Sequence, residues 1–252
     1  EHYAARIWSN TSGAILMLKR HIDDYHFLAD NKTGMTMRWG KTMQDDPRFA
    51  PVPELADISI SNHCTKGCSF CYRNSGNNHE WMSVEDYCSV LDAMNHQEYG
   101  NVFQVALGGG EPLEHPDFLT IIDETVKRGV VPNFTTNGVH LTEDICNNIQ
   151  GKVGAVAISA ITVHDIDKDK VDMLHHYGIE TNIHYVLSSE NIKEATEIAY
   201  GKYYQLLAGV NAIIFLTYKP AGRAGFEGVI KRGEDYDSFL IAIGMKDVVR
   251  PK

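Results

Sequence analysis

From residue 56 onward, short apolar runs alternate with longer segments of helical periodicity, and this alternation constrains the fold more than any other feature. The apolar runs are nearly continuous, as in strands that are buried on both faces of a parallel sheet, and the segments between them supply helical crossovers. Ser83 is the expected N-cap of the first helix. The expected strands are 56–61, 101–107, 130–136, 153–159, 179–188 and 211–218, and the expected helices are 83–97, 116–129, 142–149, 168–178 and 192–208.

The pattern predicts an α/β protein and leaves two architectures open. An incomplete or full βα barrel and a doubly wound open sheet both fit, because hydropathy does not distinguish them. Residues 25–40 are typical of two short strands around a turn, and a Pro-rich connection follows them. We therefore expect an N-terminal hairpin extension at 1–55, a core at 56–225 and a C-terminal segment at 226–252, which is either a closing strand or helix or the stub of something longer.

Composition narrows the class of protein. The chain of 252 residues is 43% hydrophobic, which is enough for a large core, and it contains no apolar run long enough to span a bilayer. A net charge of -10 disfavours nucleic acid as a partner, because phosphate binding needs a basic face. The five cysteines and the lack of a signal-peptide pattern favour reduced thiols in a cytoplasmic, soluble protein without a membrane partner.

Three of the cysteines, Cys64, Cys68 and Cys71, lie within eight residues directly after the first expected strand. A structural zinc site normally has four protein ligands, so this reading needs His63 or His79 as the fourth. An iron-sulfur cluster held by three cysteines would keep one iron open to another ligand. The remaining two cysteines, Cys88 and Cys146, fall in helical patterns beside apolar neighbours and are expected to be small buried hydrophobes.

The segment "CTKGCSFC" resembles the C-x3-C-x2-C signature of radical S-adenosylmethionine (SAM) enzymes, with Phe70 in the aromatic position before the last cysteine. The resemblance implies a partial (β/α)6 TIM-like barrel in which the cysteine segment follows the first strand. It also implies that the cysteines are the ligands of a 4Fe-4S cluster and that the amino and carboxylate groups of SAM bind the fourth iron.

The end of the second expected strand, "GGGEP", resembles the GGE motif with which the same family binds the SAM amino group. Gly109 and Gly110 permit a close backbone approach, and Glu111 offers an acceptor for an ammonium group; a tight turn with a solvated Glu is the alternative. By the same resemblance, Asn137 contacts the SAM ribose and Ser159 lies near its carboxylate or ribose. Both residues also have ordinary explanations, as a turn and as a helix cap.

Two further positions are candidates from strand periodicity and charge. Asn182 and His184 share one face of the fifth expected strand, so this polar pair is the better candidate for a barrel interior, although a strand His is also common as a structural side chain. After the sixth expected strand, "TYKPAGRAG" places Tyr218, Lys219 and Arg223 at the rim. There the cations can hold a carboxylate of SAM or substrate, or remain solvated.

The resemblance implies that a reduced cluster cleaves SAM to methionine and a 5′-deoxyadenosyl radical, which abstracts a substrate hydrogen; no catalytic side chain is identified. The hairpin, the cysteine segment and "YKPAGRAG" are most similar to the branch that modifies ribosomally made peptides, often with cysteine-rich (SPASM-type) C-terminal extensions. This sequence has no cysteine after Cys146. A small-metabolite substrate and a non-enzymatic Fe-S or zinc module remain the alternatives, and a flavodoxin or ferredoxin is the implied electron donor.

Overall fold

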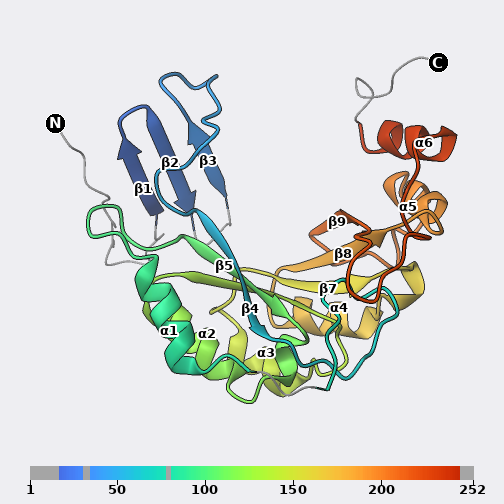
Figure 1. The fold of residues 1–252 in the computed structure, drawn as a ribbon, viewed down its shortest axis with the longest axis horizontal. Coiled ribbons are helices and arrows are strands. Elements are labelled where there is room, and N and C mark those ends of the chain that lie inside the picture. The colour runs from blue at the N-terminus through green and yellow to red at the C-terminus, as the bar shows by residue number, and fades with distance from the viewer. Residues whose placement is uncertain (1–16, 31–34, 78–80, 245–252) are drawn as a thin grey trace.

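The computed structural model describes residues 17–30, 35–77 and 81–244, in which two sheets are present (Figure 1). The larger has six parallel strands and forms the centre of the molecule. Its strands are β4 (Leu55–Ser61), β5 (Gln104–Gly109), β6 (Val131–Thr136), β7 (Val156–Ala160), β8 (Thr181–Leu187) and β9 (Ala212–Thr217).

The order of the large sheet decides between the two architectures. Its strands lie side by side in chain order, from β4 to β9. A doubly wound sheet reverses its order at a switch point, whereas sequential order with right-handed crossovers puts the helices on one face and curves the sheet. Because β4 and β9 are the two ends of the sheet, the barrel is open. The predicted partial (β/α)6 barrel is therefore confirmed, and the doubly wound alternative is wrong.

The helices follow the predicted alternation, and α1 to α3 cover the outer, convex side of the sheet (Figure 1). Ser83 caps α1 as expected, because its hydroxyl accepts a hydrogen bond from the Asp86 amide at 3.0 Å. The helix predicted at 192–208 ends at Ala199, and the rest of that segment forms turns. The helices are α1 (Val84–Ala93), α2 (Phe118–Lys127), α3 (Glu143–Ile149), α4 (Lys168–His176), α5 (Ile192–Ala199) and α6 (Glu234–Ala242), with short 3-10 turns η1 (Pro112–Glu114) and η2 (Val163–Asp165).

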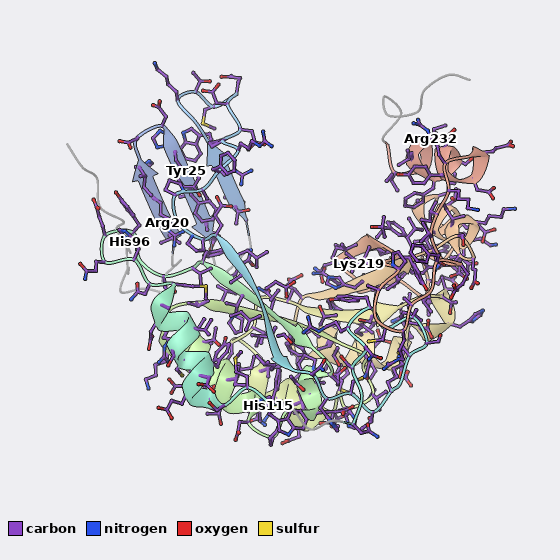
Figure 2. The ribbon with its side chains drawn as sticks, viewed as in Figure 1. Arg20, Tyr25, His96, His115, Lys219 and Arg232 are labelled. Carbon is purple, nitrogen blue, oxygen red and sulfur yellow. The ribbon has the colours of Figure 1, made fainter. Side chains whose placement is uncertain are left out.

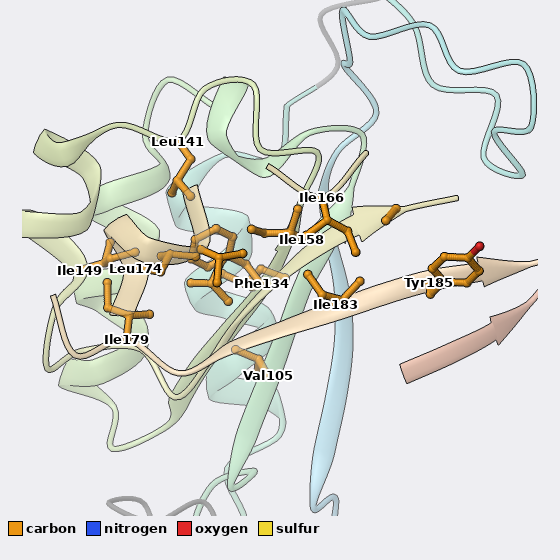
Figure 3. Close-up of a cluster of buried hydrophobic side chains, with 14 of the residues drawn as sticks. Val105, Phe134, Leu141, Ile149, Ile158, Ile166, Leu174, Ile179, Ile183 and Tyr185 are labelled. Carbon is orange, nitrogen blue, oxygen red and sulfur yellow. The ribbon is translucent and has the colours of Figure 1, made fainter. Parts of the chain in front are cut away.

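The main core lies between this sheet and its helices (Figure 3). Alternate strand residues point toward the helices, as Ile183 and Tyr185 of β8 do, and both are fully buried. Phe134 of β6 meets Phe118 of α2 edge to face, with 5.0 Å between ring centroids. Most of the opposite set of strand residues, including Asn182 and His184, is only partly buried. The sheet therefore presents an apolar outer face and a more polar inner face.

The N-terminal region forms a separate three-stranded antiparallel sheet. The predicted strands of residues 25–40 are present as β2 (Tyr25–Asp30) and β3 (Thr36–Trp39), although the turn between them lies largely outside the described residues. A further strand, β1 (Met17–Ile22), pairs with β2 and was not predicted. The extension is therefore larger than a hairpin.

Arg20 of β1 fastens this small sheet to the barrel, and the side chain is fully buried (Figure 2). Its guanidinium donates to the backbone carbonyls of Tyr99 at 3.0 Å and Pro53 at 2.9 Å, and also to that of Asn101. Burial lowers the pKa of Arg20, against the opposing effects of Tyr25 and Glu54. The contacts connect β1 to the segments that precede β4 and β5.

The C-terminal segment, for which the sequence left a strand or a helix open, contains α6 in its described part. Phe239 of α6 packs edge to face on Phe215 of β9, with 5.0 Å between ring centroids, so this helix joins the main core. In the described ranges, no helix has both the length and the apolar character that crossing a membrane requires.

Candidate functional site

The cysteine loop (residues 62–76) leaves the carboxyl end of β4 and is closed at its base by backbone hydrogen bonds. The amide of Cys64 donates to the carbonyl of Gly76 at 2.8 Å, and that of Gly76 donates to the carbonyl of Asn62 at 3.3 Å. Within the loop, the amide of Cys71 donates to the carbonyl of Cys68 at 3.3 Å. All three thiols of the loop are partly exposed. The loop thus presents them at the end of the barrel where parallel α/β folds bind ligands.

The environments of the loop thiols differ. Burial by itself raises the pKa of Cys71. Backbone hydrogen bonds at Ser75 and Arg73 and the charge of Arg223 together outweigh this effect, so the pKa of Cys71 is lowered overall. Burial raises the pKa of Cys68, and the neighbouring Lys66 opposes it only in part. Cys71 is therefore better prepared than Cys68 to be a thiolate ligand.

The geometry of the site bears on which metal group the thiols fit. Among the described residues, no three or more His, Cys, Asp or Glu side chains form a group that could hold a metal ion. His79, one candidate for a fourth zinc ligand, lies outside those residues. A single zinc needs its ligands close around one point, whereas the cysteines of a cubane cluster each bind a different iron and are spread more widely. Three partly exposed thiols that do not surround a single point are compatible with such a cluster.

The glycines at the end of β5 pack against the base of the cysteine loop. A Cβ on Gly110 would lie 1.9 Å from the carbonyl oxygen of His63, and one on Gly109 would lie 2.0 Å from that of Ser61. Gly109 also has a φ of 119°, which favours glycine. The amide of Gly110 donates to the Ser61 carbonyl at 2.7 Å. These glycines therefore allow β5 to lie directly against the backbone of Ser61 and His63, and their approach to SAM stays a prediction.

Glu111 is buried, with 1% of its surface exposed. Its carboxylate accepts from the Thr136 hydroxyl at 2.6 Å, the Asn137 amide at 2.7 Å and the Leu113 amide at 3.2 Å. Burial raises the pKa of Glu111, and these hydrogen bonds lower it in part. The carboxylate thus connects the ends of β5 and β6, and the alternative of a tight turn with a solvated Glu is wrong. Its contact with a SAM ammonium stays a prediction.

Glu114 of η1 is a site residue that the sequence analysis missed. Its side chain is 6% exposed and accepts from the Thr65 amide at 3.1 Å and the Thr65 hydroxyl at 2.7 Å. The ring nitrogens Nε2 of His63 and His140 each lie 3.2 Å from the same carboxylate. Glu114 therefore holds the start of the cysteine loop, on both sides of Cys64. The only sequence signal was a second acidic residue three positions after Glu111.

The inner face of the sheet brings His184 together with residues of other strands. The Nδ1 atom of His184 lies 3.2 Å from the Thr135 hydroxyl of β6, although β7 separates the two strands. Strands two apart lie roughly 9.5 Å from each other, so this contact requires a concave inner face. Burial lowers the pKa of His184, and Asp57 of β4 opposes this shift, which places that carboxylate within electrostatic reach. Period-two spacing from Asn137 could have indicated Thr135.

The other predicted positions are spread over the cysteine loop, the end of β6 and the inner face of the sheet, and Asn182 lies near the amino end of β8. Asn137 follows β6, and its Nδ2 lies 3.9 Å from the Cys64 sulfur, so it reaches the cysteine loop. Ser159 of β7 pairs in register with His184 and is partly exposed. Asn182 lies on the same face, and Phe70 is half-buried within the loop. Their contacts with SAM stay predictions.

Arg223, predicted to bind a carboxylate, contacts the cysteine loop. Its Nε donates to the Cys68 carbonyl at 3.0 Å, and its Nη1 donates to the Ser75 carbonyl at 2.6 Å and to Oδ1 of Asn74 at 3.4 Å. These contacts do not use Nη2, so carboxylate binding through that nitrogen stays a prediction.

The two cysteines outside the loop differ in burial. Cys146 is buried as expected. Cys88 is half-buried, with its sulfur 3.7 Å from Glu124, so the expectation of a buried Cys88 is wrong.

Comparison with known proteins gives a family match over this same region. The family described as the radical SAM superfamily matches residues 58–200, more than half of the chain. The chain is 25% identical over 187 residues to the tungsten-containing aldehyde ferredoxin oxidoreductase cofactor-modifying protein of Pyrococcus furiosus, which covers 65% of this chain and 51% of that protein. It is 31% identical over 116 residues to the mycofactocin maturase MftC of Mycobacterium tuberculosis, or 46% and 29% of the two chains.

The fold is similar to that of solved structures. SuiB of Streptococcus suis, crystallised with the precursor peptide SuiA, superposes with a TM-score of 0.66 at 12% identity, over 85% of this chain and 65% of SuiB. At that identity the likeness concerns the fold alone. The chain spans about half or less of the length of the two relatives named above.

Proposed function

The chain belongs to the radical SAM superfamily, and from this premise we propose that it binds a 4Fe-4S cluster on Cys64, Cys68 and Cys71 and starts radical chemistry with SAM. When bound, the cluster supplies the electron that cleaves SAM to methionine and a 5′-deoxyadenosyl radical, which takes a hydrogen atom from the substrate. One observation carries the proposal: a loop at the carboxyl end of β4 presents three partly exposed thiols, and its base packs against the glycines that end β5.

The neighbouring strand ends supply the proposed SAM site. Asn137 reaches Cys64 with its side chain and donates its amide to Glu111, so it lies between the cysteine loop and the end of β5. This position supports contact with the SAM ribose beside the open iron. Ser159 and His184, paired in register on the inner face, are further polar groups for SAM or substrate. Burial lowers the pKa of His184 and so favours its neutral form, which can accept or donate a hydrogen bond.

The proposed substrate is a ribosomally made peptide, and a flavodoxin or ferredoxin is the proposed electron donor in the cytoplasm. Three observations support the peptide. The chain matches a maturase over 116 residues, and the fold resembles that of a protein crystallised with its precursor peptide. The open barrel, whose edge strands β4 and β9 do not pair, also offers an elongated substrate a way in. A small metabolite is the competing substrate.

Anaerobic reconstitution tests the cofactor and the reaction. With iron, sulfide, dithionite and SAM, we expect cluster formation and the release of 5′-deoxyadenosine. Cys68→Ser should abolish both, whereas the matched control Cys88→Ser, at a thiol on α1 outside the loop, should leave both unchanged. Protein prepared without air that carries one zinc on Cys64, Cys68 and Cys71 and yields no 5′-deoxyadenosine would contradict the proposal.

Isotope transfer tests the substrate. A precursor peptide encoded next to the gene, prepared with deuterium on its carbon atoms, should transfer deuterium to 5′-deoxyadenosine, because the radical takes hydrogen from carbon. A shuffled peptide of the same composition is the control. If neither peptide transfers deuterium and a deuterated small metabolite does, the enzyme acts on metabolites.

A further inference from the structure

The loop that follows β9 packs on the cysteine loop, and we propose that it holds the cysteine loop in its cluster-binding shape, with Arg223 as the positioning residue. This β9 loop comprises residues 218–225. The inference rests on the proposed function, because it takes residues 62–76 as the cluster site. The contact joins two loops that are far apart in the sequence, because Arg223 lies 155 positions after Cys68.

Hydrogen bonds from Arg223 fix the second half of the cysteine loop at several points. The guanidinium donates to the carbonyls of Cys68 and Ser75, and the backbone amide of Arg223 donates to the Cys71 carbonyl at 3.0 Å. Two of these three acceptors belong to the proposed cluster ligands themselves. A guanidinium has five donors in a rigid plane, so it can define the distance between two carbonyls in a way that a lysine cannot.

The backbone of the β9 loop is shaped for this contact. Gly222 has a φ of 64°, and a Cβ there would lie 2.5 Å from the carbonyl oxygens of both Cys71 and Tyr72. The two backbones therefore meet at a distance that only glycine allows. In the same loop, the Lys219 ammonium lies over the Tyr72 ring, 4.7 Å from its centroid (Lys219 is labelled in Figure 2).

The open barrel explains why such a contact is needed. In a closed barrel, pairing of the first and last strands fixes the loops that follow them. Here β4 and β9 are the unpaired ends of the sheet, so the cysteine loop after β4 and the β9 loop are joined by their own contacts. Glu114 holds the first half of the cysteine loop at Thr65, and its contacts do not extend to Cys68 or Cys71. Those two ligands depend on the β9 loop.

The test compares Arg223→Gln and Arg223→Lys with Arg48→Gln, a control that removes the same charge from an exposed site outside both loops. In the apoprotein, hydrogen exchange of the peptide that covers residues 62–76 should be about tenfold faster in Arg223→Gln, since a charged hydrogen-bond donor is lost. Peptides from β5 and β7 should be unchanged. Arg48→Gln should match the wild type throughout.

The reconstituted protein gives a second readout that does not depend on turnover. Arg223→Gln should lose iron to a chelator several-fold faster than the wild type, and its cluster midpoint potential should shift downward because a nearby positive charge is gone. Arg223→Lys should keep most of the potential but still lose iron faster, because it retains the charge and not the planar fork.

Three results would overturn the inference. One is loop exchange in Arg223→Gln equal to that of Arg48→Gln. Another is a uniform rise in exchange over the whole barrel, which would make Arg223 a general stabiliser. The third is complete rescue of iron retention by Arg223→Lys. Failure of the wild type to take up a cluster would contradict the proposed function instead, and the exchange of the apoprotein would still show whether the β9 loop holds the cysteine loop.

Discussion

The molecule uses the same chemistry at two junctions, and the junctions differ in their access to water. Arg20 joins the N-terminal sheet to the barrel, and Arg223 joins the β9 loop to the cysteine loop; each donates to backbone carbonyls far away in sequence. Arg20 is fully buried, whereas Arg223 is exposed. A buried carbonyl that loses its donor has no water to replace it, while an exposed one does. The first contact should therefore determine global stability and the second only local order.

The largest expected effect is at Arg20. Arg20→Met keeps the length of the side chain and leaves the carbonyls of Pro53, Tyr99 and Asn101 without their donor. The free energy of unfolding should fall by about 3 kcal/mol, measured by urea denaturation. Arg38→Met is the matched control on the same sheet, because Arg38 forms exposed ion pairs with Asp46 and Glu54 and should cost far less. Equal losses in the two variants would break the comparison between buried and exposed contacts.

A second effect concerns the base of the cysteine loop, where the backbone of β5 lies directly against that of His63. Gly110→Ala puts a Cβ where the His63 carbonyl now lies, so the backbone must move, and we expect a loss of about 2 kcal/mol together with poor cluster uptake. Gly108→Ala is the control, because a Cβ there meets no atom within 4 Å. Denaturation and iron content measure the two consequences. Unchanged stability in Gly110→Ala would show that the base is looser than its contacts indicate.

A smaller effect is expected at Glu114. Its side chain is nearly buried, as Arg20 is, but it contacts only a loop, as Arg223 does. Glu114→Gln keeps the shape and removes the charge that His63, His140 and the Thr65 amide contact. We expect a loss of about 1 kcal/mol, with faster hydrogen exchange confined to the start of the cysteine loop. Glu197→Gln, at an exposed ion pair with Lys202, should change neither quantity measurably.

The contrast between the junctions also explains what the sequence could predict. The six strands, five of the helices and the cysteine loop followed from local patterns, because apolar periodicity and ligand spacing are local. Strand β1 was missed because Arg20 occupies its buried face, and a charged residue in a core position breaks the alternation that identifies a strand. The helix from Ile192 was predicted too long because apolar residues after Ala199 continue the periodicity while the chain turns at Gly201.

At the site too, local patterns could be predicted and contacts between distant segments could not. Cys64, Cys68 and Cys71 could be found from their spacing, whereas the roles of Glu114 and Arg223 depend on which loops meet in space. A cation at a strand end is compatible with a substrate carboxylate, with solvent or with a neighbouring carbonyl, and only the fold shows that Arg223 contacts the loop.

The smallest expected effect separates hydrogen bonding from charge at the exposed junction. Lys219 contacts the Tyr72 ring of the cysteine loop through its ammonium, with no backbone carbonyl involved in that contact. An exposed cation–π contact contributes about 0.5 kcal/mol, so Lys219→Gln should speed hydrogen exchange of residues 62–76 only about twofold. Lys219→Arg, which keeps the cation over the ring, is the control and should match the wild type. If Lys219→Gln accelerates exchange as much as Arg223→Gln, positive charge rather than directed hydrogen bonds orders the loop. Directed hydrogen bonds would then hold the Arg20 junction, whereas positive charge would hold the junction between the β9 loop and the cysteine loop.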